Sequence, residues 1–294
     1  MSAVLPVTDG LVAAWDFQQG IDSRTLYDIS GNGHHGAITG GATWTPEGLL
    51  FDGTGSINVG NLGGPLGSDY TIVALVDLEG GSGGTIIDRR NTGYNTSVGR
   101  GFLVSISQST TTLLHYQNIS RYDVYKYIPL TSPDKWQVIT AHADTSTMDI
   151  WLGANSQPAS TGTNTTGLVD HDADCWIGKT AYADSGYLDG KIGYIAVYNR
   201  KLSKDEVYSV KAAIRSSMAS RGVMLPPPIP PMIAITLDDA YASDYFVSYR
   251  LASARGIPVT SYIVTDFIGR SGKLTWNQIH TMRSSNFGIE CHTK

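Results

Sequence analysis

Two adjacent carboxylates and one imidazole are the residues of this sequence best placed to do chemistry. Asp238 and Asp239 follow residues 232–237, an apolar run that predicts a strand, and His292 follows a similar run at 287–291. Open α/β sheets bind ligands at the carboxyl ends of their strands, so these positions favour a catalytic or metal-binding site. The alternative is structural, because an Asp that follows a strand often caps the next helix.

The residues around them predict a unit in which strands and helices alternate. Apolar runs at 232–237, 259–264 and 287–291 predict strands, and residues 242–255 and 276–284 predict helices. This alternation implies a partial α/β (βαβαβ) fold with a parallel sheet. Three parallel strands and two helices leave a face and an edge of the sheet uncovered. We therefore expect the front part of a larger domain.

Residues 236–241, Thr-Leu-Asp-Asp-Ala-Tyr, and residues 292–293, His-Thr, resemble two motifs of the polysaccharide deacetylase family, which is carbohydrate esterase family four-like. Those motifs read Thr-Phe-Asp-Asp-Gly and His-(Ser/Thr)-x-x-His. The resemblance implies a metal-dependent hydrolase, with zinc the expected ion, that removes N- or O-acetyl groups from a glycan. By this resemblance Asp238 is the general base, and Asp239 and His292 are metal ligands. The metal would lower the pKa of a bound water and polarise the acetyl carbonyl while the free carboxylate takes the proton.

The match departs from the family's pattern at three positions. Leu237 replaces Phe, and Ala240 replaces Gly, which restricts the backbone beside the two carboxylates. The second His of the motif would fall at position 296, beyond Lys294. We therefore expect a metal site with two of its three ligands, inactive as it stands. Cys291 neighbours His292 on a predicted strand, so its thiol should point to the opposite face and serve packing.

A proline-rich stretch separates this segment from a region of different character. Five prolines occur within residues 226–231 and favour a polyproline II spacer, with an ordered loop packed on one domain as the alternative. We expect a first domain at 1–222, a linker at 223–231 and the deacetylase-like segment at 232–294.

Before the linker the sequence predicts a mainly β domain. Short runs rich in β-branched and aromatic residues alternate with Gly-, Asn-, Asp- and Ser-rich turns, which is typical of a sandwich or jelly roll. A capping box at 203–206 predicts one closing helix, and Gly222 can end it in a left-handed conformation. The predicted strands are 11–17, 50–59, 70–78, 85–89, 101–107, 112–117, 135–142, 148–152, 175–178 and 188–198.

Several segments of this region occur in a recognisable order. They are 10–17, 28–36 (Asp-Ile-Ser-Gly-Asn-Gly-His-His-Gly), 50–53, 136–138, 188–192 and 197–203. Together they resemble the laminin G-like domains, which are similar to concanavalin A-type lectins and glucanases. The resemblance covers residues 7–221 and implies a jelly roll that binds carbohydrate or protein.

The turn that begins at Asp28 also suggests a calcium site. Asp28, Ser30 and Asn32 occupy alternate positions as in an EF-hand loop. However, the twelfth position is Thr39 rather than Glu and no helices flank the loop, which excludes an EF-hand. A structural calcium ion near Asp28, Asn32 and Asp189 is one interpretation, since related jelly rolls often carry one. A turn closed by Asx hydrogen bonds is the other.

Tyrosines supply the candidate glycan contacts, because aromatic rings stack on the apolar faces of sugars while carboxylates and amides accept hydroxyl hydrogen bonds. Asp123, Tyr125 and Tyr127 share one face if that stretch is a strand. Ordinary packing is the alternative for each of them. Further candidates are Tyr94, Tyr116 and Tyr182. Three tryptophans are expected in the core: Trp15, Trp136 and Trp151.

The charge of the chain argues against two classes of binding partner. The net charge of −5 and the pI near 5.7 argue against nucleic acid or an anionic membrane surface. No run approaches the ~20 apolar residues of a membrane span, and the N-terminus lacks the features of a secretory signal. Only Cys175 and Cys291 occur, in different predicted domains, so a disulfide framework is not expected.

We therefore expect a lectin-like module that binds a cell-surface or capsular polysaccharide, fused to a metal-dependent deacetylase that acts on it. The expected location is extracellular or virion-associated, with a phage tail protein as the analogy. One alternative is a non-catalytic glycan-binding or virion adhesion protein. Another is a sandwich that mediates protein contacts, such as the assembly of a homo-oligomer.

Overall fold

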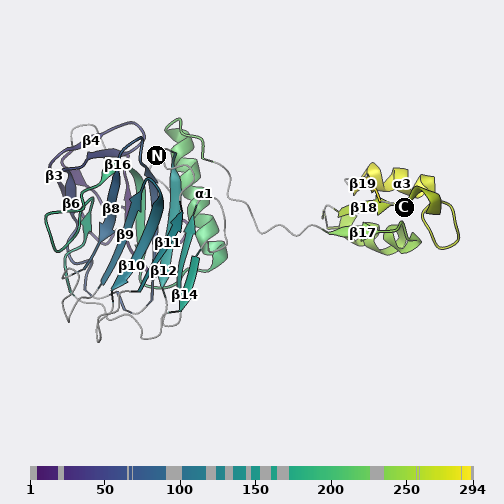
Figure 1. The fold of residues 1–294 in the computed structure, drawn as a ribbon, viewed down its shortest axis with the longest axis horizontal. Helices are drawn as coiled ribbons and strands as arrows, with labels where there is room; N and C mark the ends of the chain where they lie inside the picture. Colours follow the sequence, from purple (N-terminus) through teal and green to yellow (C-terminus); the bar gives the residue numbers. More distant parts are fainter. Residues whose placement is uncertain are drawn as a thin grey trace. The chain divides into compact units, whose positions relative to one another are not determined.

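The structure is a computed structural model in which the chain divides into two compact units, Met1–Pro230 and Pro231–Lys294. Each unit is described by itself (Figure 1). The described residues are 5–18, 23–64, 66–67, 69–90, 101–116, 124–129, 135–143, 147–152, 160–163, 172–225, 235–255, 257, 259–285 and 287–292. For residues 111–116, 124–129, 147–152 and 160–163 the description is of the backbone alone.

The first unit is mainly β, as its sequence predicts. Its described residues form a curled antiparallel sheet of 16 strands. The strands are β1 (Leu11–Asp16), β2 (Thr25–Leu26), β3 (Gly36–Thr39), β4 (Ala42–Trp44), β5 (Leu49–Asp52), β6 (Ser56–Asn58), β7 (Tyr70–Asp77), β8 (Gly83–Asp88), β9 (Gly101–Ser107), β10 (Thr110–Tyr116), β11 (Val124–Pro129), β12 (Gln137–Ala143), β13 (Thr147–Leu152), β14 (Ser160–Thr163), β15 (Trp176–Ile177) and β16 (Asp189–Tyr198).

The strands fold into two layers, the back layer and the front layer. The back layer has the order β14-β13-β12-β7-β16, and β1 and β5 pair with β16. The front layer has the order β8-β15-β6-β3-β2 and continues from β8 through β9 and β10 to β11. The layers join where Asp189 of β16 pairs with Gly83 of β8. This is the arrangement of a jelly roll.

The strand β7 is apolar at nearly every position because both of its faces are covered. Ile72, Ala74 and Val76 belong to the core between the two layers, whereas Val73 and Leu75 belong to a second core on the outer side of the back layer. Successive side chains of a strand point to opposite faces, so a strand buried on both sides shows no polar alternation.

The helix α1 (Lys204–Ser220) supplies that second core and lies along the strands (Figure 1). The hydroxyl of Ser203 accepts from the amide of Glu206, and the Glu206 carboxylate accepts from the Ser203 amide at 2.8 Å, which confirms the predicted capping box. Gly222, just beyond the helix, has φ of 83°. The apolar side chains that α1 buries are Val207, Val210, Ile214 and Met218.

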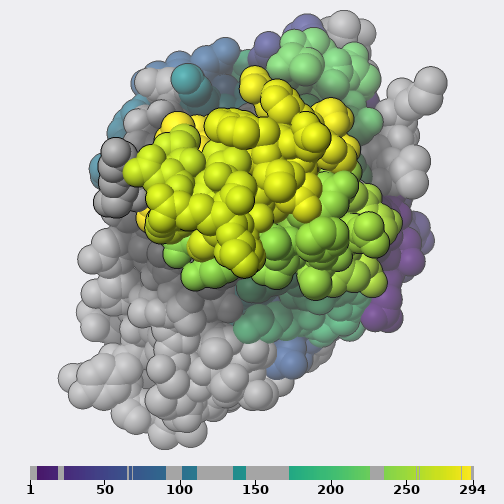
Figure 2. Space-filling model, turned by 90° about the vertical axis from the view of Figure 1, so that its right-hand side faces the viewer, coloured from purple at the N-terminus to yellow at the C-terminus, as the bar shows by residue number. Residues whose placement is uncertain are grey.

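The second unit is built on a parallel sheet in the order β17-β18-β19, and its helical segments follow the strands. A small core that includes Val259, Met282 and Phe287 joins sheet and helices. Figure 2 shows one face of this unit, coloured light green to yellow. The elements are β17 (Thr236–Asp238), η1 (Asp244–Tyr249), α2 (Arg250–Ser253), β18 (Val259–Ile263), η2 (Thr265–Phe267), α3 (Trp276–Arg283) and β19 (Phe287–Cys291).

One element of the second unit differs from its prediction. The helix expected at 242–255 is α-helical at Ala242 and Ser243, continues as the π-helical segment η1, and becomes α-helical again at Arg250. Wide turns of this kind occur mostly as short insertions and often near functional sites. Across both units, no described helix has the length and apolar character needed to cross a membrane.

Candidate functional site

A strained turn follows β17 at the carboxyl edge of the parallel sheet. Asp239 and Ala240 have φ of 69° and 55°, in the left-handed region that favours glycine. Ala240, which the sequence marks as restricting the backbone, is fully buried in this conformation. Such residues cost on the order of 1–3 kcal/mol each and cluster at functional sites.

Lys273 holds this turn from the loop before α3. Its Nζ donates to the carbonyl of Asp239 at 2.9 Å and lies 3.4 Å from the centre of the Tyr241 ring. The amide of Leu274 donates to the carbonyl of Ala240, also at 2.9 Å. Two tertiary contacts therefore fix the backbone beside the carboxylates.

Asp244 is a buried carboxylate near the same turn. Its Oδ2 has no hydrogen-bond partner among the residues that the structure describes. Burial raises the pKa of Asp244, a hydrogen bond with the Tyr241 backbone and the charge of Lys273 lower it, and the Asp238 carboxylate raises it again. The net direction is upward, so this group gains a proton more readily than an ordinary aspartate.

The capping interpretation of the two carboxylates receives no support from the geometry. The helical segment η1 begins at Asp244 with Ser243 at its N-cap position, and no side chain caps it. Asp238 and Asp239 therefore do not cap the helix that follows them.

His292 lies at the same edge of the sheet as the strained turn. The three strands are parallel, and His292 follows the last residue of β19 directly, with its amide donating to the carbonyl of Ile263 at 2.9 Å. The strand β18 lies between β17 and β19, which separates the two outer backbones by about 10 Å. Cys291 is exposed.

The metal centre that the deacetylase resemblance implies is not complete in the described part of the chain. Among those residues, no group of three or more His, Cys, Asp or Glu side chains is arranged to hold a metal ion. The donor set present, Asp239 with His292, therefore does not fit such an ion by itself, and we derive no catalytic step through one.

In the first unit, the Asp28 turn is closed by hydrogen bonds to protein groups. Oδ1 of Asp28 accepts from the amides of Ala14 (3.0 Å) and Ser30 (2.8 Å), and Oδ2 accepts from the Ser30 hydroxyl (2.8 Å) and the His34 amide (3.0 Å). The side-chain amide of Asn32 donates to the carbonyls of Leu11 and Val12. The four bonds to the Asp28 carboxylate match the Asx-turn interpretation.

Asp189 lies away from this turn. Its Oδ2 accepts from the amide of Ser82 at 3.0 Å, at the start of β16. Asp28 instead binds Ala14, which pairs with Ala196 near the other end of β16. Seven residues of strand correspond to about 23 Å, so the structure does not bring Asp189 to Asp28 and Asn32.

The predicted tyrosine candidates fall on or near the front layer. Tyr125 and Tyr127 occupy alternate positions of β11, and Tyr116 is the last residue of β10. Asp123 and Tyr94 lie outside the described residues. The core prediction holds for Trp15, which is fully buried, while Trp136 is partly buried against the second core. For Trp151 the structure describes the backbone in β13 alone.

The register of the front layer aligns polar and aromatic residues in one row. Asn58 of β6 pairs with Trp176 of β15, and Trp176 pairs with Asp88 of β8. Directly opposite residues of antiparallel strands share a face. Their strand neighbours Ile57 and Ile177 belong to the inner core, so the row lies on the outer face of the front layer.

The loop that follows β15 carries further rings and charges over this face. The ammonium of Lys179 lies 4.3 Å from the centre of the Trp176 ring and 5.9 Å from that of Tyr187. Asp184 accepts from Lys179 at 3.3 Å and from the Tyr187 hydroxyl. That hydroxyl, followed by Lys179, lowers the pKa of Asp184, and the Asp184 carboxylate raises the pKa of Tyr187.

A buried ion pair anchors the loop to the sheet. Arg90 donates to both oxygens of Asp88, at 2.9 Å and 2.7 Å, and Asp88 also accepts from the amide of Ala181 at 3.1 Å. The guanidinium of Arg90 lies 4.9 Å from the centre of the Tyr182 ring, which is 37% exposed. We call Trp176, Lys179, Tyr182, Asp184 and Tyr187, together with the Asp88–Arg90 pair, the Trp176 surface.

Amide–carboxylate pairs border the Trp176 surface. Asn58 donates to Asp174 at 2.9 Å, and Asn61 donates to Asp172 at 2.6 Å. Both carboxylates are exposed. The surface thus combines partly exposed rings with hydrogen-bonding groups, which is the chemistry that sugar recognition requires.

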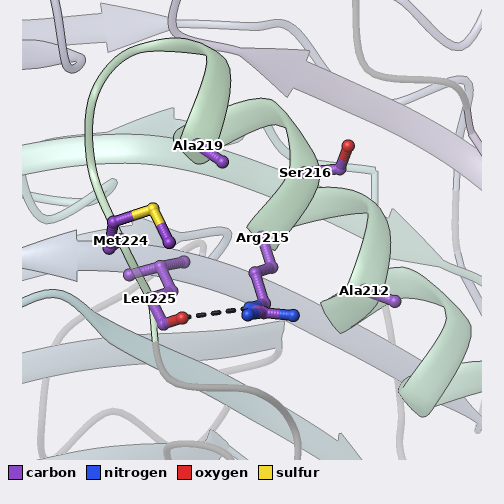
Figure 3. Close-up of a pocket in the computed structure, with 6 residues that line it drawn as sticks. All are labelled: Ala212, Arg215, Ser216, Ala219, Met224 and Leu225. Atoms are coloured by element: carbon purple, nitrogen blue, oxygen red, sulfur yellow. Dashed lines mark hydrogen bonds between the residues drawn. The ribbon is translucent and has the colours of Figure 1, made fainter.

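A hollow of about 290 Å³ lies elsewhere on the unit, beside α1 (Figure 3). Arg215 points into it and donates from Nε to the carbonyl of Leu225 at 3.0 Å (Figure 3). The other residues that line the hollow are Ala212, Ser216, Ala219, Met224 and Leu225. The lining contains no aromatic ring and its one cation is engaged, so it lacks the features of the Trp176 surface.

A family model covers more than half of the chain. The model of the concanavalin A-like lectin/glucanases superfamily matches residues 51–208. The chain belongs to this superfamily. The match contains β15 and the loop that carries the Trp176 surface. No curated protein sequence matches the chain.

Solved structures of this lectin-like fold resemble the chain at low sequence identity. Botulinum neurotoxin type C, which depends on interaction with two ganglioside molecules for its access to cells, matches with a TM-score of 0.52 at 14% identity over 72% of this chain and 52% of that one. The receptor-binding domain of the botulinum neurotoxin C/D mosaic serotype matches with a TM-score of 0.51 at 12% identity over 70% of this chain and 51% of that one. A Trypanosoma rangeli sialidase mutant matches with a TM-score of 0.51 at 16% identity over 71% of this chain and 33% of that one. The chain thus spans about half the length of the toxin domains, and the likeness shows the fold.

Sequence reasoning on this lectin-like domain missed Trp176. The signal was present, because Trp176 stands between Cys175 and Ile177 in a predicted strand. Both neighbours are fully buried, so the alternation of a strand directs Trp176 outward. Asp88, Arg90 and Lys179 could not be found in this way, since tertiary pairing alone brings them together.

Proposed function

We propose that the jelly roll is a carbohydrate-binding module and that the Trp176 surface is its binding site. The observation that carries this proposal is the set of rings Trp176, Tyr182 and Tyr187 on the outer face of the front layer, each beside a cation that fixes its position. Rings held in place lose little conformational entropy when a sugar stacks on them.

The row that contains Trp176 extends across the front layer. From Asp88 it passes through Leu103 and Leu114 to Tyr125 of β11. Four strand spacings separate Trp176 from Tyr125, or about 19 Å. An extended polysaccharide is therefore a better match to this face than a single sugar. The ganglioside interaction of the similar toxin is in keeping with a glycan partner.

Binding of the chain to an array of oligosaccharides tests the proposal. We expect Trp176→Ala to weaken binding at least about tenfold, as loss of a central aromatic contact does. The matched control is Trp276→Ala, which removes a Trp that is 58% exposed on α3 of the second unit. Equal loss in the two variants, or none in either, would place the glycan site elsewhere.

We further propose that the complete protein is a metal-dependent polysaccharide deacetylase that acts on the glycan held by the jelly roll. In this proposal Asp238 is the general base, and Asp239 and His292 are two ligands of a zinc ion. The strained turn at Asp239–Ala240, at the carboxyl edge of the sheet, supports it. The partner would be a cell-surface or capsular polysaccharide, and the protein would be extracellular or part of a virion such as a phage tail.

Acetate release from acetylated polysaccharides by the full-length protein, with zinc added, tests this second proposal. Asp238→Asn should abolish release and leave glycan binding intact. The rival is a non-catalytic adhesion protein, which the incomplete ligand set among the described residues favours. Glycan binding without any acetate release would establish the rival.

A further inference from the structure

We propose that the Trp176 surface selects uncharged sugars and rejects sugars that carry a carboxylate or sulfate. This inference rests on the proposed glycan-binding function and adds the class of ligand. It follows from the charged side chains of the surface, whose cations are bound to protein groups and whose exposed groups are carboxylates.

The cations of the surface are already engaged. Lys179 pairs with Asp184 at 3.3 Å and stacks on Trp176, and only 13% of its side chain is exposed. Arg90 makes a two-pronged bond to Asp88, and 2% of its side chain is exposed. A buried cation that already has its counter-charge gains little from a second anion.

Arg89, which follows Asp88 in the chain, is also bound to protein groups. Arg89 is fully buried, and its guanidinium donates to the carbonyls of Asn61, Gly64 and Ala173. Such bonds place its donors inside the protein and away from a ligand on the outer face. Around Trp176, the cations that the structure describes are therefore all engaged by protein groups, and none of them is presented to an anionic sugar.

The accessible charges are negative. The side chain of Asp184 is 84% exposed, and Asp172 and Asp174 are exposed beside the row. Carboxylates accept strong hydrogen bonds from neutral hydroxyl groups, and they repel a carboxylate or sulfate on a bound sugar. The same three groups thus favour neutral sugars and disfavour anionic ones.

Matched pairs of glycans test this selectivity directly. The chain is titrated with galactose-terminated oligosaccharides and with the same oligosaccharides capped by sialic acid, at low and at physiological salt. We expect the neutral member to bind about tenfold more tightly, with the difference smaller at the higher salt because exposed charges are screened. Equal affinity, or preference for the sialylated member, overturns the inference.

Two variants separate this inference from the proposed function. Asp174→Asn removes one exposed charge and keeps the size of the side chain. It should therefore reduce the difference in affinity between neutral and anionic glycans and leave folding unchanged. If Trp176→Ala abolishes binding but neutral and anionic glycans bind the wild type equally, the glycan site stands and the selectivity is wrong. If neither neutral nor anionic glycans bind, both are wrong.

Discussion

The ammonium of Lys273 donates to the backbone carbonyl of Asp239 at 2.9 Å across 34 positions of the chain. This bond joins the loop before α3 to the turn after β17. The turn holds two non-glycine residues with left-handed φ, so local preference does not explain it. A contact between distant segments therefore determines where the Asp238 and Asp239 carboxylates lie.

Loss of that bond should loosen the turn. We expect Lys273→Met to destabilise the second unit by about 1–2 kcal/mol, because a charged hydrogen bond to a carbonyl is removed. Faster hydrogen exchange at the amides of residues 239–242 in the full chain would report the change. Arg270→Met is the control, since Arg270 stacks on Phe267 in the same loop. Equal exchange rates in the two variants would show that Lys273 does not hold the turn.

The Asp28 turn predicts a loss of stability in acid. Burial alone would raise the pKa of Asp28, but the hydrogen bonds from Ala14, Ser30 and His34 outweigh it and lower the pKa below its usual 3.8. A lowered folded-state pKa gives stability that is present above 3.8 and is lost as the pH falls below it toward the folded value.

Thermal unfolding at pH 7 and pH 3 measures this effect. Asp28→Asn should be less stable than the wild type at pH 7, and its stability should change less between the two pH values. Asp172→Asn, an exposed carboxylate of the same unit, is the control. A wild type and an Asp28→Asn variant that lose the same stability in acid would exclude Asp28 as the titrating group.

Calcium should have no effect on the stability of the jelly roll. Both carboxylate oxygens of Asp28 are bound to protein donors, and Asn32 donates its amide to two carbonyls. These groups therefore offer few free oxygens to a cation. We expect the thermal midpoint to be the same with calcium and with EDTA. A lower midpoint in EDTA would restore the calcium interpretation.

The end of α1 is tied to β1 by a buried ion pair. Arg221 donates to Asp16, and their side chains are 1% and 3% exposed. Burial lowers the pKa of Arg221 to about 10, so it stays charged at neutral pH. We expect Arg221→Met to cost about 3–5 kcal/mol in urea unfolding, because the Asp16 carboxylate loses its buried counter-charge. The double variant Arg221→Met with Asp16→Leu should recover part of that loss. A single variant within about 0.5 kcal/mol of the wild type would contradict the prediction.

The sequence predicted those elements whose signals are local. The strand at 101–107 was predicted with the bounds of β9, and the Ser203 capping box fixed the start of α1, because both depend on residues close in the chain. Short strands such as β3 and β4 were missed, since three or four residues carry too little periodicity. The π-helical segment at Asp244–Tyr249 likewise has no signature in the pattern of apolar residues.

The candidate sites were less predictable than the fold because tertiary pairing assembles them. Asp28 and Asp189 each suited a cation by residue type, yet the length of β16 separates them. The Trp176 surface draws on β8, β15 and the loop that follows β15, and its Asp88–Arg90 pair is visible only after the strands align. Residue types alone do not encode such distances.

The helix α1 covers the outer side of the back layer, and this determines which fragments of the protein can stay soluble. Without the helix, Val73 and Leu75 of β7 and Tyr194, Ala196 and Tyr198 of β16 would meet solvent as one apolar sheet surface. Exposed surfaces of this kind promote aggregation. The family match ends at residue 208, inside α1, so a fragment cut there would lose most of the helix and should precipitate. A soluble fragment of the jelly roll has to extend through Gly222.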